Sequence, residues 1–446
     1  MNLGNRVPAS AQPSSSNRIS RRRFLAQATT VAAAPHVVPA SVLGRGGAAA
    51  PSERITLGFI GVGSRGMDHV RAFSGRQDAQ VLAVCDPYQS KCEAAKLFVE
   101  SQYGSKGGSY AGCAAYSDFR ELIARDDIDA VVIASPEHWH GLHGAMAAQK
   151  GKDVYGEKAL TLTVAEGRAL VNTVRRYGRV FQVGLQQRSS RDFRFACELA
   201  RNGYLGKLHT VKVGVPGGRS LDNVPPAPVP PGLDYEMWLG PAPFTPYNEL
   251  KCTFNWYFIY DYCVGWIQSW GVHHIDIAQW GAPSLATGRL RVKGSAVFPA
   301  AGIADTSITW RVECRAEDGL LLRFSDDGYH LHGCRFEGDK GWVHVDRENI
   351  KTEPASLLSA VLKPGEERLY DSADHYGNFI ECVRTRRDPA APVESGHSAT
   401  TITILADIAT RLGREMTWDW KSERFIGDDP GNRMLSRTMR SPWMIL

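Results

Sequence analysis

Apolar residues between Ile55 and Val183 come in short runs that alternate with longer amphipathic stretches. The short runs have the length and composition of strands, and the longer stretches place apolar residues at helical spacing. Strands that alternate with helices predict a parallel sheet covered by helices on both faces. The pattern predicts strands over 55–60, 80–85, 129–134, 152–156 and 179–184, and helices over 66–74, 89–102, 118–124, 141–150 and 163–177.

Beyond residue 205 the pattern changes to strands that are joined by Gly and Asp turns. Residues 307–314, 320–324 and 341–345 include period-two alternation, which predicts an antiparallel sheet with one solvated face. Helices are expected near 189–202, 272–281, 373–386 and 398–412. The predicted fold class is α/β: a doubly wound parallel Rossmann sheet over residues 51–188, then an α/β domain with an open antiparallel sheet over 189–446.

A glycine motif follows the first predicted strand. Gly61, Gly63 and Gly66 have the spacing G-x-G-x-x-G, and they open a helix. These glycines allow a tight turn, close approach of backbone to a pyrophosphate, and packing of helix on strand. Asp86 ends the next strand, about 20 residues on, where a carboxylate accepts hydrogen bonds from the adenosine ribose. A carboxylate there repels a 2′-phosphate, so the motif predicts NAD rather than NADP.

Two further polar segments follow predicted strands at the same edge of the sheet. Ser135-Pro136-Glu137-His138-Trp139-His140 follows strand 129–134, and Glu157-Lys158-Ala159 follows strand 152–156. Ligands of doubly wound sheets bind at the carboxyl ends of the strands. We therefore expect both segments to border the dinucleotide.

The first fifty residues have no acidic residue and six arginines, including the run Ser20-Arg21-Arg22-Arg23-Phe24-Leu25. A weakly apolar stretch to Ala34 follows, which is too short to cross a bilayer. This pattern predicts a twin-arginine signal, export to the periplasm and no stable membrane insertion. The formal charge is +5 for the whole chain, so residues 51–446 carry −1. A near-neutral body without basic runs argues against nucleic acid as a partner.

Nine scattered cysteines without a C-x-x-C pair imply no disulfide framework. His330 and His332 alternate on one predicted strand, as metal ligands can. No third ligand accompanies them in the sequence, so no metal site is predicted.

With these motifs the chain resembles the Gfo/Idh/MocA family, the glucose-fructose oxidoreductase and inositol dehydrogenase group. The resemblance rests on the glycine motif, Asp86, the segment 135–140, Glu157-Lys158 and His273-His-Ile-Asp276. It extends from about Arg54 to the C-terminus. It implies a carbohydrate or polyol substrate and a homo-oligomer formed through the C-terminal sheet.

The resemblance also assigns catalytic roles. Lys158 is expected beside the nicotinamide and the substrate hydroxyl, where it stabilises a developing alkoxide or takes a proton. His273 is expected to transfer a proton, and Asp276 to orient or cap. The chain departs from the family at Ala159, where relatives have proline, and at Ser269, where many relatives have aspartate. The expected cofactor-binding residues are Gly61, Gly63, Ser64, Arg65, Gly66, Asp86, Pro136, Glu137, Trp139, His140, Glu157, Lys158 and Gln186.

The predicted export signal narrows the functional hypotheses. Outside the cytoplasm there is no free NAD pool, so the cofactor should be held tightly and restored within each cycle. The main hypothesis is an exported NAD-dependent sugar oxidoreductase that transfers a hydride at a ring hydroxyl. One alternative is an NAD-dependent glycosidase or lyase that acts by transient oxidation of C3 and elimination. Another is a non-catalytic NAD-binding module.

Overall fold

The first sheet has six parallel strands in the order β3-β2-β1-β4-β5-β6. The structure is a computed structural model that describes residues 53–105 and 111–445. The strand order reverses at β1 and β4, which creates the crevice where such sheets bind ligands. The strands are β1 (Ile55–Ile60), β2 (Ala79–Cys85), β3 (Ala114–Tyr116), β4 (Ala130–Ile133), β5 (Asp153–Gly156) and β6 (Phe181–Val183).

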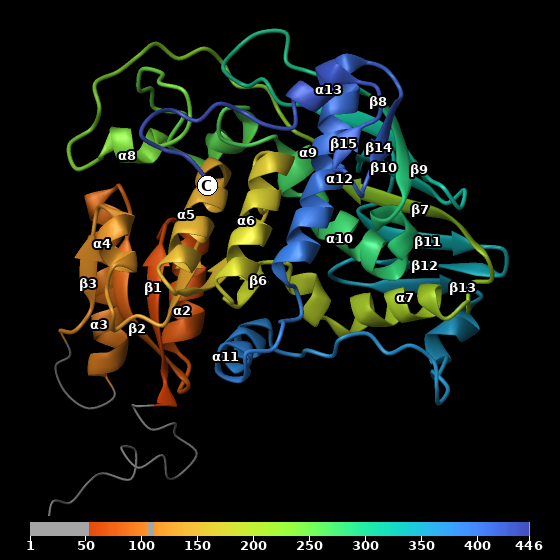
Figure 1. The fold of residues 1–446 in the computed structure, drawn as a ribbon, viewed down its shortest axis with the longest axis horizontal. Helices are drawn as coiled ribbons and strands as arrows, with labels where there is room; N and C mark the ends of the chain where they lie inside the picture. Colours follow the sequence, from red (N-terminus) through yellow and green to blue (C-terminus); the bar gives the residue numbers. More distant parts are fainter. Residues whose placement is uncertain (1–52, 106–110, 446) are drawn as a thin grey trace, which may run out of the picture. The chain divides into compact units, whose positions relative to one another are not determined.

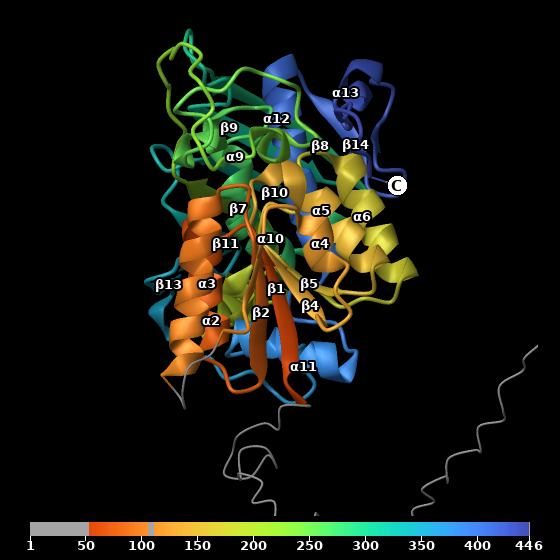
Figure 2. The ribbon, with the colours of Figure 1, turned by 90° about the vertical axis from the view of Figure 1, so that its left-hand side faces the viewer.

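Helices cover both faces of this sheet. The four residues of β4 are all buried, as expected for a strand that is covered on both sides. Figure 2 shows α2 (Ser64–Ser74) and α3 (Gln89–Gly104) on one side of the strands, and α4 (Phe119–Ile123), α5 (Glu137–Gln149) and α6 (Val164–Arg176) on the other.

The alternating pattern predicted this sheet with two differences. The three-residue strand β3 was not predicted, because so short a segment shows no clear period. Helix α5 begins at Glu137 rather than at residue 141, since Pro136 supplies its N-cap. Proline favours helix starts, so part of the segment 135–140 is helical rather than a loop.

The second sheet has nine strands in the order β13-β12-β11-β7-β10-β9-β8-β14-β15. All neighbours are antiparallel except β7 and β10, which are parallel. The predicted antiparallel sheet is therefore a mixed, mostly antiparallel one. Its strands are β7 (Leu208–Val215), β8 (Arg289–Val297), β9 (Thr309–Ala316), β10 (Leu321–Asp326), β11 (Gly333–Gly338), β12 (Gly341–Val345), β13 (Ile350–Glu353), β14 (Met416–Asp419) and β15 (Arg424–Phe425).

Two buried helices, α10 and α12, pack on one face of the nine-stranded sheet, and α12 also packs on α6 (Figure 1). Strands β8 and β9 alternate buried with exposed residues, so the opposite face is solvated. Helix α11 packs instead on the first sheet, since Phe379 and Ile380 share a core with Phe73 and Tyr155. The remaining helices are α7 (Arg191–Arg201), α8 (Tyr235–Leu239), α9 (Trp266–Ser269), α10 (Gly271–Gly281), α11 (His375–Thr385), α12 (Val393–Leu412) and α13 (Asp429–Arg433).

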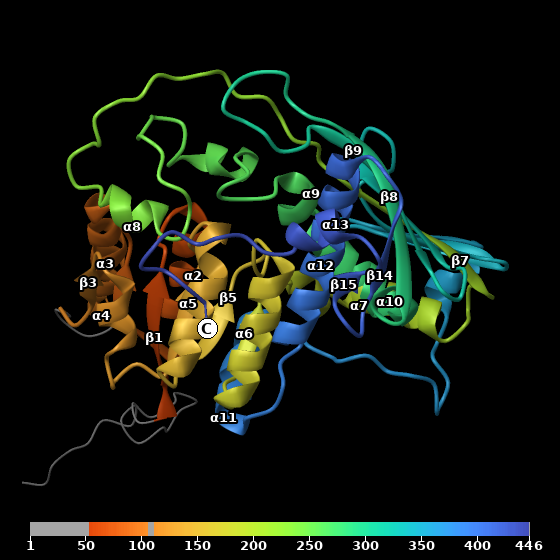
Figure 3. The same ribbon diagram turned by 45° about the horizontal axis from the view of Figure 1, so that its top comes forward.

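The long connection between β7 and α9, which includes the proline-rich stretch 224–231, runs above the upper ends of the parallel strands (Figure 3). It has a small core of its own, formed by Leu233, Trp238, Leu239 and Tyr262 among others. This core holds α8 and the 3₁₀ helix Phe254–Phe258 in fixed positions. Side chains from both contribute to the functional site.

The described residues from Arg54 onward pack as one compact unit. The boundary expected between residues 188 and 189 stays a prediction, and the expected leader over 1–50 lies outside the described residues. Within the ranges 53–105 and 111–445, we find no helix with the length and apolar character of a membrane span. All nine cysteines fall in these ranges, and each is buried and unpaired.

Candidate active site

The turn after β1 has the shape that a pyrophosphate requires. Gly61 has a φ of +84°, and a Cβ there would lie 2.6 Å from the Ser135 backbone nitrogen. A Cβ on Gly66 would lie 2.0 Å from the Gly61 carbonyl oxygen, so this glycine allows α2 to pack closely. A Cβ on Gly63 would meet nothing within 4 Å. Open space therefore faces the backbone where the motif expects the cofactor to approach.

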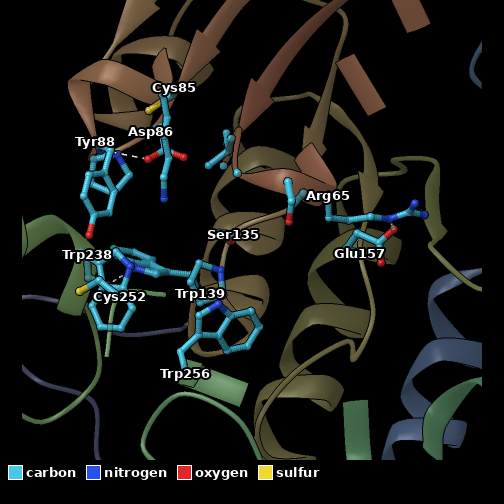
Figure 4. A pocket seen from close by; sticks show the side chains of 18 of the residues that line it. Arg65, Cys85, Asp86, Tyr88, Ser135, Trp139, Glu157, Trp238, Cys252 and Trp256 are labelled. Atoms are coloured by element: carbon cyan, nitrogen blue, oxygen red, sulfur yellow. Dashed lines mark hydrogen bonds and ion pairs between the residues drawn. The ribbon is translucent and has the colours of Figure 1, made fainter. Parts of the chain in front are cut away.

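This open space belongs to a cavity of about 420 Å³ at the carboxyl ends of the strands (Figure 4). Gly61, Gly63, Ser64 and Arg65 line one part, and Asp86 lines another. The connection between β7 and α9 closes the cavity through residues that include Trp238, Cys252, Trp256 and Tyr257. The cavity is thus lined by the glycine turn, by the carboxylate of Asp86 and by aromatic side chains of the β7–α9 connection.

Asp86 is fixed at the end of β2 by two backbone amides. Its Oδ2 accepts a hydrogen bond from Val62 N at 2.9 Å, and its Oδ1 accepts one from Tyr88 N at 2.9 Å. Burial raises the pKa of this carboxyl, while the charge of Lys91 and the two amide hydrogen bonds act in the opposite direction. The carboxylate lines the cavity in one fixed orientation, as recognition of a ribose requires.

The segment after β4 borders the cavity in part. Pro136, Trp139 and His140 line it. Trp139 Nε1 donates to the Trp238 carbonyl oxygen at 3.1 Å, and the His140 ring lies 2.7 Å from the carbonyl oxygens of Ser135 and Ala159. The expected cofactor contact of Glu137 stays a prediction, because its buried carboxylate does not line the cavity. It accepts hydrogen bonds from Ala159 N at 3.3 Å and Cys263 Sγ at 3.0 Å.

Glu157 organises the cavity wall through its own contacts. Its Oε1 accepts hydrogen bonds from Arg65 Nε at 2.9 Å and Gln186 Nε2 at 3.2 Å, and it lies 2.9 Å from His69 Nε2. Burial acts to raise the pKa of Glu157, but the His69 hydrogen bond and the Arg65 charge outweigh it and hold the pKa well below its usual range. Glu157 is thus an anion that orients Arg65.

Lys158 follows Glu157 and lines a second cavity of about 550 Å³ as well as the first. Its Nζ donates a hydrogen bond to Ser269 Oγ at 2.9 Å and lies 5.6 Å from the centre of the Tyr257 ring. The contacts of the Ala159 carbonyl and amide with His140 and Glu137 fix the backbone behind it. The two cavities share Arg65, Glu157, Lys158, Phe254 and Tyr257.

The second cavity has a largely aromatic wall. Phe254 and Tyr257 of the β7–α9 connection, Trp266 of α9 and Trp270, which precedes α10, line it. Aromatic rings of this kind stack on the apolar faces of sugars. Three other aromatic residues of this region lie elsewhere: Trp256 lines the first cavity, Tyr260 packs between Arg411 and Arg437, and Tyr262 is fully buried.

His273 lies on α10 and lines the second cavity with Lys158. Its Nδ1 is buried and finds no hydrogen-bond partner among the described residues. Burial lowers the pKa of His273 well below its usual value, and the positive charges of Lys158 and Arg347 lower it further. The imidazole is therefore neutral at pH 7 and can accept a proton.

Each of the two domains matches a known description of one protein family. The description "Oxidoreductase family, NAD-binding Rossmann fold" matches residues 55–185, and "Oxidoreductase family, C-terminal alpha/beta domain" matches residues 215–445, more than half of the chain. The chain belongs to the Gfo/Idh/MocA oxidoreductase family. Its first domain is an NAD-binding Rossmann domain, and the open space beside Gly63 and the orientation of Asp86 fit that cofactor.

Curated relatives carry glycosidase names. Glycosyl hydrolase family 109 protein 1 of Shewanella sp. strain MR-4 is 32% identical over 207 residues, which are 43% of this chain and 45% of the relative. Alpha-N-acetylgalactosaminidase of Shewanella oneidensis is 31% identical over the same number of residues, with the same shares of the two chains. The chain thus spans less than half the length of these relatives.

Among solved structures, the WlbA dehydrogenase from Bordetella pertussis, in complex with NADH and UDP-GlcNAcA, superposes with a TM-score of 0.60. The superposition covers 81% of this chain and 98% of the other, at 17% identity. An identity this low shows that the Gfo/Idh/MocA fold is shared and nothing more.

Two residues of α10 that follow His273 line neither cavity: Asp276, which was expected at the site, and His274. Asp276 is buried in an ion pair with Arg188, with two contacts of 2.7 Å, and so holds α10 against the 3₁₀ helix Gln186–Ser189. His274 lies 3.4 Å from Gln187 Nε2, and its ring is 5.0 Å from that of His332. Over the ranges that the structure describes, no group of three potential metal ligands occurs.

Sequence reasoning missed Arg347, Gln187 and Tyr376, which also line the second cavity. Arg347 lies in the turn Asp346-Arg-Glu-Asn between β12 and β13, where a charged residue has no distinctive pattern. Tyr376 comes from α11, about 220 residues after Lys158 in the chain, and only the packing of α11 on the first sheet places it there. No local signal predicts these contacts.

The Asp86→Ala variant is expected to weaken NAD binding by about ten- to a hundredfold, because a carboxylate that hydrogen-bonds a hydroxyl contributes about 1.5–3 kcal/mol. The same change is expected to reduce the preference for NAD over NADP, since it removes the charge that repels a 2′-phosphate. Calorimetric titration with both nucleotides checks this. Asp126→Ala, an exposed carboxylate away from the cavity, is the control. An unchanged ratio of the two affinities would contradict the ribose role of Asp86.

Proposed function

We propose that this protein is an NAD-dependent glycosidase that acts by transient oxidation at C3 of a sugar. The observation that carries the proposal is the position of Lys158, which lines both the NAD-binding cavity and the aromatic second cavity. A sugar in the second cavity therefore meets the lysine at the border with the cofactor. His273, a neutral base, lines the same cavity.

Two residues of the chain suit the chemistry at the C3 oxygen and at C2. When bound, NAD provides a reversible acceptor for one hydride. As the hydride leaves C3, the proton of the C3 hydroxyl passes to water. Lys158 stabilises the developing negative charge on the C3 oxygen by a hydrogen bond, and Ser269 Oγ fixes the lysine in place. A carbonyl at C3 makes the C2 proton acidic, and His273 takes that proton. The C1–O bond then breaks, and the departing oxygen receives a proton.

The return half of the cycle restores the sugar. Water adds across the C1–C2 double bond: its oxygen joins C1, and a proton returns to C2. Reduction of the C3 carbonyl and protonation of its oxygen regenerate the hydroxyl. The sum is hydrolysis of one glycosidic bond, with no net change in the cofactor. No external oxidant or reductant is required.

The names of the curated relatives support a glycosidase over a dehydrogenase, although the match spans less than half of their length. A sugar oxidoreductase, our main hypothesis from the sequence, uses the same cavity and the same lysine. The two functions differ in whether the C1 bond breaks. If the protein is instead a non-catalytic NAD-binding module, substitution of Lys158 changes no turnover.

The test is an assay of the full chain, without added NAD, on a panel of 4-nitrophenyl glycosides that includes N-acetylgalactosaminides. We expect release of phenol and no lasting absorbance from NADH. A sugar-to-sugar oxidoreductase instead releases no phenol and oxidises one sugar only when a second is present. NADH that accumulates from added NAD with a single sugar would contradict both closed cycles.

We also propose export by the twin-arginine route, on the basis of the segment Ser20-Arg21-Arg22-Arg23-Phe24-Leu25. A closed redox cycle suits a compartment without free NAD. Fractionation of cells that express the full chain checks this: the protein is expected in the periplasm, and the double variant Arg21→Lys, Arg22→Lys is expected to stay in the cytoplasm. Export of the double variant would contradict the assignment.

A further inference from the structure

The second cavity has more positive than negative charge. Three cationic side chains line it, Arg65, Lys158 and Arg347, and its one carboxylate is Glu157. Glu157 is 2.9 Å from Arg65 Nε, so these two charges offset each other. Among residues 53–105 and 111–445, neither Lys158 Nζ nor the Arg347 guanidinium has a carboxylate oxygen within 4 Å that forms an ion pair. The cavity therefore presents two cations without a protein counter-ion.

Arg347 is held on a fixed turn. The turn joins β12 to β13, and Asp346 Oδ1 accepts hydrogen bonds from Glu348 N at 2.8 Å and Asn349 N at 2.7 Å. The Arg347 guanidinium lies 4.7 Å from the centre of the Trp270 ring. Stacking of this kind covers a face of the guanidinium and leaves the N–H groups at its edge free to donate.

Ser269 adds to this imbalance. At this position a neutral hydroxyl accepts the Lys158 hydrogen bond at 2.9 Å. A carboxylate beside Lys158 would repel an anionic substrate. With serine, the inner end of the cavity holds a lysine without an anion, and its outer part holds an exposed arginine. Burial is the main cause of the lowered pKa of His273, and the charges of Lys158 and Arg347 lower it further. Both cations therefore act on the part of the cavity that His273 lines.

We propose that the sugar bound in the second cavity has a singly charged anionic substituent, a carboxylate or a sulfate ester, which Arg347 binds through its free N–H edge. The inference rests on the proposed function in one respect, that the second cavity holds the sugar. A planar carboxylate matches the two parallel N–H groups of a guanidinium, and a single negative charge is balanced by a single arginine. Arg347 is then a specificity residue, and Lys158 remains free for the C3 oxygen.

The test measures binding rather than turnover. The full chain, supplemented with NAD, is titrated with methyl glucuronides and galacturonides, with the matching glucosides and galactosides, and with their 6-sulfates. Tryptophan fluorescence reports binding, because Trp270 and Trp266 line the cavity. We expect at least one charged glycoside to bind about tenfold or more tightly than its uncharged partner, on the scale of one charge-assisted hydrogen bond. Whether the carboxylates or the sulfates show this gain identifies the anion.

Arg347→Gln is expected to remove that preference, so that a charged glycoside and its uncharged partner bind with similar affinity. Arg347→Lys is expected to restore it in part, because a lysine keeps the charge but loses the planar pair of donors. Arg311→Gln is the matched control, since this exposed arginine stacks on Tyr329 at 4.2 Å and lies outside the cavity. Equal affinity for charged and uncharged glycosides, no binding of any charged glycoside, or a preference that survives Arg347→Gln would overturn the proposal.

Failure of this proposal is distinguishable from failure of the glycosidase proposal. Phenol release from uncharged aryl glycosides, without any preference for uronides or sulfates, would support the glycosidase proposal and contradict the proposal of an anionic substrate. Preferential binding of charged glycosides, without phenol release from their aryl derivatives, would contradict the glycosidase proposal and support the role of Arg347 in binding the anion.

Discussion

Lys158→Met is expected to lower turnover about a hundredfold or more, the scale for loss of a positioned proton-transfer group. Methionine has a similar length but cannot donate to Ser269 Oγ or to the C3 oxygen of a sugar. NAD content is expected to stay the same, because Asp86 and the glycine turn lie elsewhere in the first cavity. Steady-state rates on the best aryl glycoside, with the nucleotide measured by mass spectrometry after denaturation, check both parts.

The control for this variant is Lys351→Met, which removes an exposed lysine on β13 that lines neither cavity. It is expected to retain full activity. Near-normal turnover of Lys158→Met would show that Lys158 is structural. Loss of bound NAD together with activity would show instead that the lysine acts through the cofactor site.

His273→Ala is expected to lower turnover to a similar degree, since it removes the neutral base of the second cavity. His274→Ala is the matched control, because the adjacent histidine faces Gln187 and His332 and lines neither cavity. The measurement is kcat for both variants on one substrate. Equal losses in the two variants would contradict the assignment of the base to His273.

The pH profile gives a second readout for His273. Burial, Lys158 and Arg347 lower its pKa well below the ordinary 6.5, so the base form persists as the pH falls through 6.5. The base form is lost only when the pH falls through the lowered pKa. We therefore expect that, in the wild type, kcat/KM falls on the acidic side only below pH 6.5. A fall that already begins above pH 6.5 would contradict a lowered pKa for the base.

The first sheet was largely predictable because each of its longer strands is a local apolar run that is bounded by a turn or a helix. The glycine motif and Asp86 share an edge of the sheet by the rule for parallel strands, and the structure places both on one cavity. The strand β3 was missed because three residues show no period. The start of α5 was wrong by four residues, because the helical pattern is weak in a segment that is buried on all sides.

The second cavity was only partly predictable. Lys158 and His273 were placed by resemblance, and the structure brings both to one cavity. Asp276 and Glu137 were expected at the site, yet both carboxylates are buried in contacts with protein groups. Sequence spacing on a helix gives the face of a residue but not its partner, so the Arg188 ion pair could not be foreseen. Arg347 depends on the packing of a hairpin turn that is far from Lys158 in the sequence.

Hydrolysis of an aryl glycoside in deuterated water tests the central claim most directly. If His273 removes the C2 proton during a closed cycle of oxidation and elimination, the released sugar carries deuterium at C2. The phenol appears in equal amount, and no NADH accumulates. A product without deuterium at C2 would show that the C2 proton does not exchange with solvent during turnover and would contradict the proposed mechanism.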